Sequence, residues 1–269
     1  MCLIVFNWSP GDSVQLRIAS NRDEFYDRPT SPAHWWPETS DKQISILAGR
    51  DLQANGAWLG VTRNRRLAAV TNYRDPANLR LQAESRGLLV KQFLLGEDQT
   101  DIDSFVNKLR LQREKYNHYN LLMYDGITLV GYSSFNDLLT VFKPGFHAVS
   151  NACFDTVWPK TMQAKTRMAT ALALHDEKDI TAALFDLLSD KTEAADAQLP
   201  STGVSLERER ALSAAFIKLD GYGTRSSTLV KIEHDEVLFI ERNFVPPLAE
   251  DKCFRFSKEY SFRSTPSER

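Results

Sequence analysis

The residue with the clearest chemical potential is Cys2, which opens an apolar segment at the start of the chain. An ionised thiol is the strongest nucleophile among the side chains. Removal of Met1 would also give this residue a free α-amine, whose reference pKa of about 7.7–8.0 lies close to neutrality. One residue could therefore supply both a nucleophile and a general base. The alternative is a cysteine that packs as a small buried hydrophobic side chain.

A charged cluster follows the second expected strand, where residues 20–24 read Ser-Asn-Arg-Asp-Glu. If that strand pairs with the first one in a hairpin, these side chains come close to Cys2. Asp23 could then hold the α-amine, as the third group of a catalytic triad orients the base. Arg22 could lower the pKa of the thiol, because a nearby positive charge favours the thiolate. A solvated charged turn is the alternative explanation for such a cluster.

Three further polar groups lie at the ends of expected strands. Asn72 and Asn151 each follow a strand, and an asparagine side chain can donate a hydrogen bond to an oxyanion. Arg225 comes shortly after a Gly-Tyr-Gly segment, and its guanidinium could bind a carboxylate or a developing oxyanion. The alternatives are structural, because Asn72 could begin a turn before Pro76 and the glycines could belong to an ordinary hairpin.

The segments that must position these groups are mostly predicted strands. A short apolar strand over residues 2–8 and an alternating strand over 14–19 should form a hairpin, because turn-forming residues separate them. A Pro- and Trp-rich loop then runs from about residue 26 to 39 and includes Trp35 and Trp36. Further strands are predicted at 44–50, 57–62, 67–72, 119–124, 128–132, 138–142, 147–150, 214–219, 224–233 and 236–243.

Predicted helices separate these groups of strands. They cover residues 86–95, 102–114, 160–175 and 180–188, and residues 191–205 are expected to form an exposed connector. An order of strands, helices, strands, helices and strands is typical of antiparallel sheets covered by helices. Because no linker or internal repeat divides the chain, residues 1–269 are predicted to form a single α+β domain.

Composition restricts the possible functions. A formal net charge of −2 over 269 residues gives no reason to expect a nucleic acid as a partner. No apolar run is long enough to span a bilayer and no secretory signal is recognisable, so a cytoplasmic location is expected. The 3 widely spaced cysteines indicate a reducing compartment and not a disulfide framework. Histidine and cysteine spacings fit neither a zinc site nor covalent haem, so no metal or cofactor is expected.

These segments together resemble the NRDE family, named for the Asn-Arg-Asp-Glu sequence at residues 21–24 and also called the transport and Golgi organisation 2 (TANGO2) family. The resemblance covers most of the chain and implies a four-layer αββα fold of the N-terminal nucleophile (Ntn) hydrolase kind. It also implies substrate-binding residues within the motifs, at Asn21, Arg22, Tyr73 and Arg74. The motifs that carry it are Met1-Cys2, Ser20–Glu24, Thr71–Arg74, the segment from Ser150 to Lys160, and Tyr222–Ser226.

A more distant similarity is to the choloylglycine hydrolases, which include bile-salt and penicillin V amidases. At Ser20 the chain departs from these enzymes, which carry an arginine there, and Arg22 or Arg17 could take its place. The matching positions are the nucleophile at Cys2, the aspartate that holds the α-amine at Asp23, the oxyanion asparagine at Asn151 and a late-strand arginine at Arg225.

The sequence leaves two functions open. The first is a cysteine amidohydrolase that cleaves a non-peptide carbon–nitrogen bond in a small acyl amide, with Trp35 and Trp36 lining an apolar acyl pocket. The second, implied by the family resemblance, is a non-catalytic carrier or chaperone for a hydrophobic ligand such as haem. The identity of the acyl group and the oligomeric state do not follow from the sequence.

Overall fold

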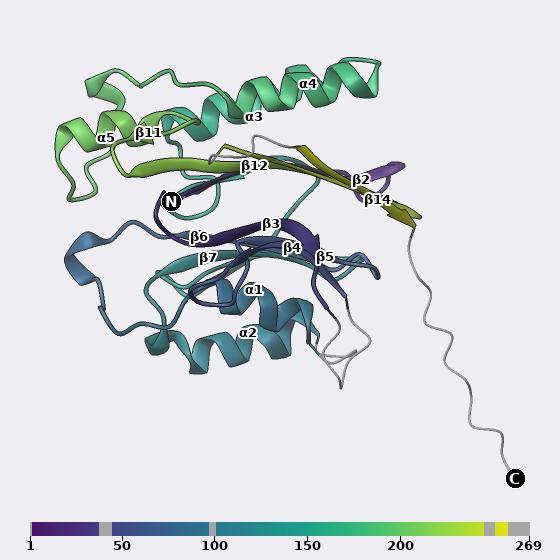
Figure 1. Ribbon diagram of the computed structural model, residues 1–269, viewed down its shortest axis with the longest axis horizontal. Coiled ribbons are helices and arrows are strands. Elements are labelled where there is room, and N and C mark those ends of the chain that lie inside the picture. The colour runs from purple at the N-terminus through teal and green to yellow at the C-terminus, as the bar shows by residue number, and fades with distance from the viewer. Residues whose placement is uncertain (1, 38–44, 97–100, 245–250, 258–269) are drawn as a thin grey trace, which may run out of the picture.

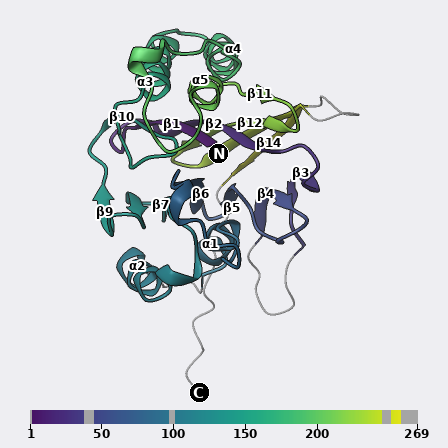
Figure 2. The ribbon, with the colours of Figure 1, turned by 90° about the vertical axis from the view of Figure 1, so that its left-hand side faces the viewer.

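The computed structural model describes residues 2–37, 45–96, 101–244 and 251–257. In these residues two antiparallel sheets lie face to face, and helices cover the outer face of each sheet (Figure 1). The αββα layering expected from the family resemblance is therefore confirmed. One outer layer contains α1 (Gly87–Leu94) and α2 (Ile102–Leu111), and the other contains α3 (Pro159–Leu172), α4 (Glu177–Leu188) and α5 (Leu206–Ser213) (Figure 2).

The first sheet carries the N-terminal strand in its interior. Its order is β10 (Gly145–Val149), β1 (Cys2–Trp8), β2 (Val14–Phe25), β12 (Tyr222–Glu233), β13 (Glu236–Asn243) and β14 (Asp251–Ser257), with the short β11 (Lys218–Leu219) paired to β12. β1 has a hydrogen-bonded partner on each side from Ile4 to Trp8, and Cys2 and Leu3 pair with β2, so the sheet holds this strand in place.

The predicted hairpin of the first two strands is present, with Cys2 directly opposite Arg22. β2 is longer than predicted, because residues 20–24 continue the strand instead of forming a turn. They can do so since β2 also pairs with β12 over most of its length. Ser20, Asn21 and Arg22 pair with both β1 and β12, whereas Asp23 and Glu24 pair with β12 alone. A register shift between Thr224 and Ser226 marks a bulge in β12 beside the same segment.

The second sheet follows the order of the chain. It runs β3 (Thr30–Trp35), β4 (Ile46–Asp51), β5 (Leu59–Thr62), β6 (Leu67–Asn72), β7 (Tyr119–Tyr124), β8 (Leu129–Ser133) and β9 (Leu138–Val141). The long connection between β6 and β7 contains α1 and α2, which cover this sheet. Short 3-10 helices lie at Pro76–Asn78, Arg113–Lys115 and Asp196–Gln198.

Apolar side chains fill the spaces between the layers. Between the sheets, one cluster joins Phe6 and Ile18 of the first sheet to Leu47 and Leu122 of the second. A second cluster packs the second sheet against α1 and α2, and a third packs β1 and β2 against α3 and α4. β1 contributes to both faces, since Leu3 belongs to the third cluster. This explains why successive residues of β1 are apolar.

Several elements differ from the sequence-based prediction. The loop predicted over residues 26–39 contains β3, and its last two residues lie outside the described part of the chain. α5 was not predicted, because few of its residues are buried and they do not form an apolar stripe. The strand predicted over residues 214–219 is reduced to β11, and the exposed edge strand β14 was not predicted at all.

Gly49 of β4 allows the ring of Trp58 to lie directly against the second sheet. A Cβ placed on Gly49 would stand 2.1 Å from the Trp58 ring. We therefore expect Gly49→Ala to lower the free energy of unfolding by about 1–3 kcal/mol, the usual effect of overpacking. Denaturant unfolding measures this change. Gly11→Ala is the control, because a Cβ there meets nothing within 4 Å. Equal stability of the two variants would contradict the close contact.

Candidate active site

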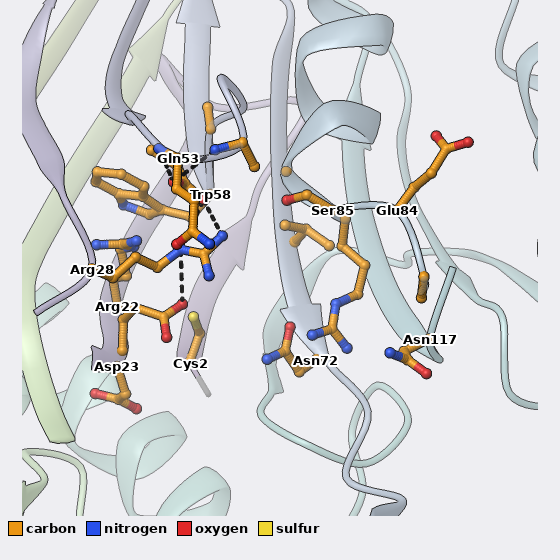
Figure 3. A pocket seen from close by; sticks show the side chains of 18 of the residues that line it. Cys2, Arg22, Asp23, Arg28, Gln53, Trp58, Asn72, Glu84, Ser85 and Asn117 are labelled. Atoms are coloured by element: carbon orange, nitrogen blue, oxygen red, sulfur yellow. Dashed lines mark hydrogen bonds and ion pairs between the residues drawn. The ribbon is translucent and has the colours of Figure 1, made fainter. Parts of the chain in front are cut away.

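A cavity of about 490 Å³ lies beside Cys2 (Figure 3). Its walls come from β1 and β2 of the first sheet, from the segments around β4 to β6 of the second, and from the residues that precede α1. In Figure 3, Cys2 lies between Arg22 on one wall and Asn72 on the other. Most of the described side chains that line this cavity are polar or charged.

The thiol of Cys2 is held in surroundings that oppose its ionisation. Burial raises the pKa of the Cys2 thiol above its ordinary value, and the negative charge of Asp23 raises it further. A backbone hydrogen bond from Asp23 and the positive charge of Arg22 lower the same pKa. Because the balance is an increase, the thiol is protonated at neutral pH and needs a base in order to act as a nucleophile.

Asp23 is buried next to Arg22 on β2. Thr224, its partner across the strands on β12, donates a hydrogen bond of 2.6 Å from Oγ1 to Oδ1 of Asp23. Burial raises the pKa of the Asp23 carboxyl, whereas the charge of Lys160 and the hydrogen bond from Thr224 lower it. The net effect is a raised pKa, so the neighbouring groups offset only part of the cost of burying the ionised carboxylate.

Lys160 lies in the first turn of α3 and was not predicted as a functional residue. Its side chain is buried, and Nζ donates a hydrogen bond of 2.8 Å to the carbonyl oxygen of Leu212. Burial lowers the pKa of Lys160 to about 8, while the negative charges of Asp23 and ionised Cys2 oppose this decrease. The one sequence signal for Lys160 was its place in a motif of the family resemblance.

The two asparagines predicted as oxyanion donors occupy different positions. Asn72, at the end of β6, lines the cavity. Asn151 is buried and is not among the described residues that line it. Its Nδ2 donates a hydrogen bond of 2.9 Å to the carbonyl oxygen of Asn72. Asn72 therefore has access to a ligand in the cavity, and Asn151 fixes the backbone that carries Asn72.

Of the two arginines considered for thiol activation, Arg22 is the one close to Cys2. Its NH1 donates a hydrogen bond of 3.1 Å to the Thr30 hydroxyl, and its guanidinium lies 4.2 Å from the centre of the Trp58 ring. Arg17 lies farther along β2 and forms a salt bridge of 2.7 Å with a glutamate of α4. Arg17 is therefore engaged elsewhere.

Arg225 of β12 is not among the described residues on the cavity wall. Its NH1 donates hydrogen bonds to the carbonyl oxygens of Phe25, at 2.8 Å, and of Arg28. These bonds fix the chain that leaves β2, which carries Arg28 into the cavity wall. The structure thus gives Arg225 a positioning role and no contact with the cavity.

Two residues predicted to bind substrate point away from the cavity. Asn21 is fully buried, with Nδ2 donating to two backbone carbonyl oxygens at 2.8 Å and Oδ1 accepting from Ser227. Arg74 forms a buried salt bridge of 2.7 Å with Glu209. The structure therefore corrects this prediction. Neighbouring strand residues face opposite sides of a sheet, so Asn21 faces the helices because Arg22 faces the cavity.

The aromatic residues predicted at the substrate site also lie elsewhere. Trp36 donates from Nε1 to a carbonyl oxygen of β4 at 2.9 Å and belongs to the core beneath α1. The ring of Trp35 lies 4.9 Å from that of a phenylalanine in β14. Tyr73 stacks on Phe135 with ring centres 4.1 Å apart. Trp35 and Trp36 are therefore not among the described residues that line the Cys2 cavity, whereas Trp58 is.

Arg86 lines the cavity and was missed in the sequence analysis. It directly precedes α1, and its NH1 donates a hydrogen bond of 3.2 Å to the carbonyl oxygen of His118. Burial lowers the pKa of Arg86, and the negative charge of ionised Cys2 opposes the decrease. No motif or periodicity marks Arg86. It was expected only as the first residue of a helix.

In the described residues, no cluster of three or more His, Cys, Asp or Glu side chains could hold a metal ion. No described helix combines the length and the apolar character required to cross a membrane. Cys2, Cys153 and Cys253 carry free thiols.

Two antiparallel sheets between helical layers, with a cysteine at the start of an interior strand, define the αββα class expected of an Ntn hydrolase. Within that class the chain belongs to the Transport and Golgi organisation 2 family, whose model matches residues 1–246. Similar proteins include the Transport and Golgi organization protein 2 homologs of Homo sapiens, 32% identical over 276 residues, and of Bos taurus, 30% identical over 266 residues. Each similarity covers 91% of this chain and 94% of the relative.

Among solved structures, the chain is similar to the Caenorhabditis elegans ortholog of N-acylethanolamine-hydrolyzing acid amidase, with a TM-score of 0.44 and 14% identity. That similarity covers 85% of this chain and 92% of the other. A mutant conjugated bile acid hydrolase from Clostridium perfringens has a TM-score of 0.43 and 8% identity, over 97% of both chains.

Proposed function

We propose that the protein is an N-terminal-cysteine amidohydrolase that cleaves the carbon–nitrogen bond of a small acyl amide once Met1 has been removed. The position of Cys2 carries the proposal. Cys2 lines a cavity, Arg22 lies opposite it on β2, and Asp23 follows Arg22 on that strand. The raised pKa of the thiol makes a base necessary, and a free α-amine on the same residue would supply one.

In the proposed reaction the α-amine of Cys2 takes the thiol proton as sulfur bonds to the amide carbon. The carbonyl oxygen becomes an oxyanion, to which the Asn72 side chain donates a hydrogen bond. Collapse of this intermediate breaks the carbon–nitrogen bond, and the α-ammonium gives its proton to the leaving amine. Water then hydrolyses the thioester to the free acid and restores the thiol. Asp23 orients the amine, and Arg22 favours the thiolate.

A carrier for a hydrophobic ligand such as haem is the second candidate. Such a carrier requires a largely apolar cavity. The described lining of the Cys2 cavity includes Arg22, Glu24 and Arg28 and is mainly polar, which favours the hydrolase. Tight haem binding with a spectral change that Cys2→Ala leaves unaltered would reverse this preference.

The proposal extends to the cellular compartment. The thiols of Cys2, Cys153 and Cys253 are free, and a free thiol persists best in a reducing environment. We therefore propose a cytoplasmic location, which fluorescence microscopy of the tagged chain tests.

Two measurements test the hydrolase proposal. The intact mass of the purified protein should correspond to a chain that begins at Cys2. Incubation with a panel of small acyl amides should then release a primary amine and a free acid in equal amounts. Amide turnover by protein that retains Met1 would contradict the mechanism. So would the absence of any turnover, across a broad panel, by protein that begins at Cys2.

A further inference from the structure

The carboxylates on the cavity wall already have partners. Arg28 forms a salt bridge of 2.7 Å with Asp51 and lies 3.9 Å from Glu24, so its positive charge offsets part of the negative charge of these two carboxylates. Glu84 accepts a hydrogen bond of 3.1 Å from the hydroxyl of Tyr116. Asp23 accepts the hydrogen bond from the hydroxyl of Thr224 on β12 that is described above.

Arg22 and Arg86 differ from this pattern. Within the described part of the chain neither forms a salt bridge, and each donates one hydrogen bond, to the Thr30 hydroxyl and to the His118 carbonyl oxygen respectively. A guanidinium has five N–H donors in a fixed fork, so both side chains retain donors at the cavity that they line. Burial lowers the pKa of both groups, which shows that their charge lacks full compensation.

The wall that carries Arg86 is fixed in position. The amide of Ala57 donates a hydrogen bond of 3.1 Å to the carbonyl oxygen of Gly87, the first residue of α1. A Cβ on Gly56 would stand 2.4 Å from the carbonyl carbon of Gly87, so the chain before β5 lies in direct contact with the helix start. Arg86 is therefore preorganised, and the amino end of α1 beside it adds partial positive charge.

We propose that the substrate of this site carries a carboxylate, which Arg86 binds while the scissile carbonyl lies at Cys2. A guanidinium with several available donors matches the two oxygens of a carboxylate. A single negative charge fits better than a phosphate dianion, because Glu24, Asp51 and Glu84 line the same cavity. The inference rests on the proposed hydrolysis of an acyl amide and names the class of that amide. Recognition of the carboxylate can nevertheless be measured without turnover.

Alkylation of Cys2 by two reagents of the same size tests the inference. Iodoacetate and iodoacetamide each form a sulfur–carbon bond with loss of iodide, and they differ in bearing a carboxylate or a neutral amide. The rate ratio of iodoacetate to iodoacetamide at Cys2 is divided by the same ratio for a small free thiol. We expect a value of roughly ten for the wild-type protein, the effect of one charge-assisted contact. Peptide mass mapping separates Cys2 from Cys153 and Cys253.

Arg86→Gln should lower this normalised ratio, and any preference that remains is due to the charge of Arg22, which also lines the cavity. A change in the thiolate fraction of Cys2 affects both reagents equally and cancels in the ratio, so the readout reports recognition of the carboxylate. Arg110→Gln is the matched control, because it removes an exposed guanidinium on α2, and it should keep the wild-type ratio. Arg86→Lys, which retains the charge, should keep part of the preference for iodoacetate. It replaces Arg86→Gln in this experiment if Arg86→Gln does not fold.

A normalised ratio at or below one in the wild-type protein would overturn the inference without any variant. An equal preference in wild type and Arg86→Gln would also overturn it. Amide turnover separates this result from the proposed function. Cleavage of neutral and carboxylate-bearing amides at equal kcat/KM contradicts the inference and leaves the hydrolase intact. If Cys2 clearly prefers iodoacetate but the protein turns over no amide, the carboxylate site is supported and the hydrolase proposal is contradicted.

Discussion

Cys2→Ala is expected to abolish hydrolysis of any acyl amide that the wild-type protein cleaves, with a decrease in rate of at least about 10⁴-fold. The sulfur of Cys2 forms the covalent bond to the acyl group in the proposed mechanism, and alanine offers no replacement for it. The fold should persist, because the backbone of β1 keeps its hydrogen bonds to β2 and β10. Initial rates of amine release and the thermal unfolding midpoint measure the two effects separately.

The other two cysteines provide matched controls for this experiment. Cys153 and Cys253 also carry free thiols, and neither is among the described residues that line the cavity. Cys153→Ala and Cys253→Ala should therefore keep activity within about a factor of two of wild type. Turnover that persists in Cys2→Ala would remove Cys2 from the role of nucleophile.

The stability of the protein is expected to rise with pH between about 8 and 10.5 because of Lys160. Burial lowers the pKa of Lys160 from 10.5 to about 8 in the folded chain. Within that window the unfolded chain binds more protons than the folded chain, so the free energy of unfolding increases as the pH rises. The full contribution, present above pH 10.5 and lost as the pH falls through 8, is on the order of 3 kcal/mol.

Lys160→Met should remove this increase. Chemical denaturation at a series of pH values, for wild type and variant in parallel, isolates the contribution of Lys160 because the other titrating groups are shared. Lys178→Met, which removes an exposed lysine on α4, should leave the wild-type pH dependence unchanged. Identical pH profiles for wild type and Lys160→Met would show that the ammonium of Lys160 titrates normally.

The fold was predictable where an apolar pattern marks an element. The bounds predicted for β6 and β13, residues 67–72 and 236–243, agree with the structure, because buried side chains recur along both strands. α5 and β14 bury few side chains, and β14 has no fully buried residue. Periodicity carries little information about such elements.

The candidate site residues that could be predicted are those that the hairpin of β1 and β2 brings close together. The register of β1 and β2 places Arg22 opposite Cys2, with Asp23 next along the strand, and a turn between two strands is visible in a sequence. Arg86 and Lys160 come from helical segments whose docking depends on the whole tertiary structure. Membership of a motif also says nothing about which face of the strand a side chain occupies, and this is why Asn21 was assigned to the wrong side.

The Asn-Arg-Asp-Glu segment divides at its middle: Asn21 and Arg22 pair with both β1 and β12, whereas Asp23 and Glu24 pair with β12 alone. Local fraying cannot release Asn21 and Arg22, because β1 and β12 would both have to detach. The amide hydrogens of Asn21 and Arg22 should accordingly exchange with solvent only when the sheet itself melts. Heating should therefore release Arg22 from the cavity wall only when the sheet itself is lost.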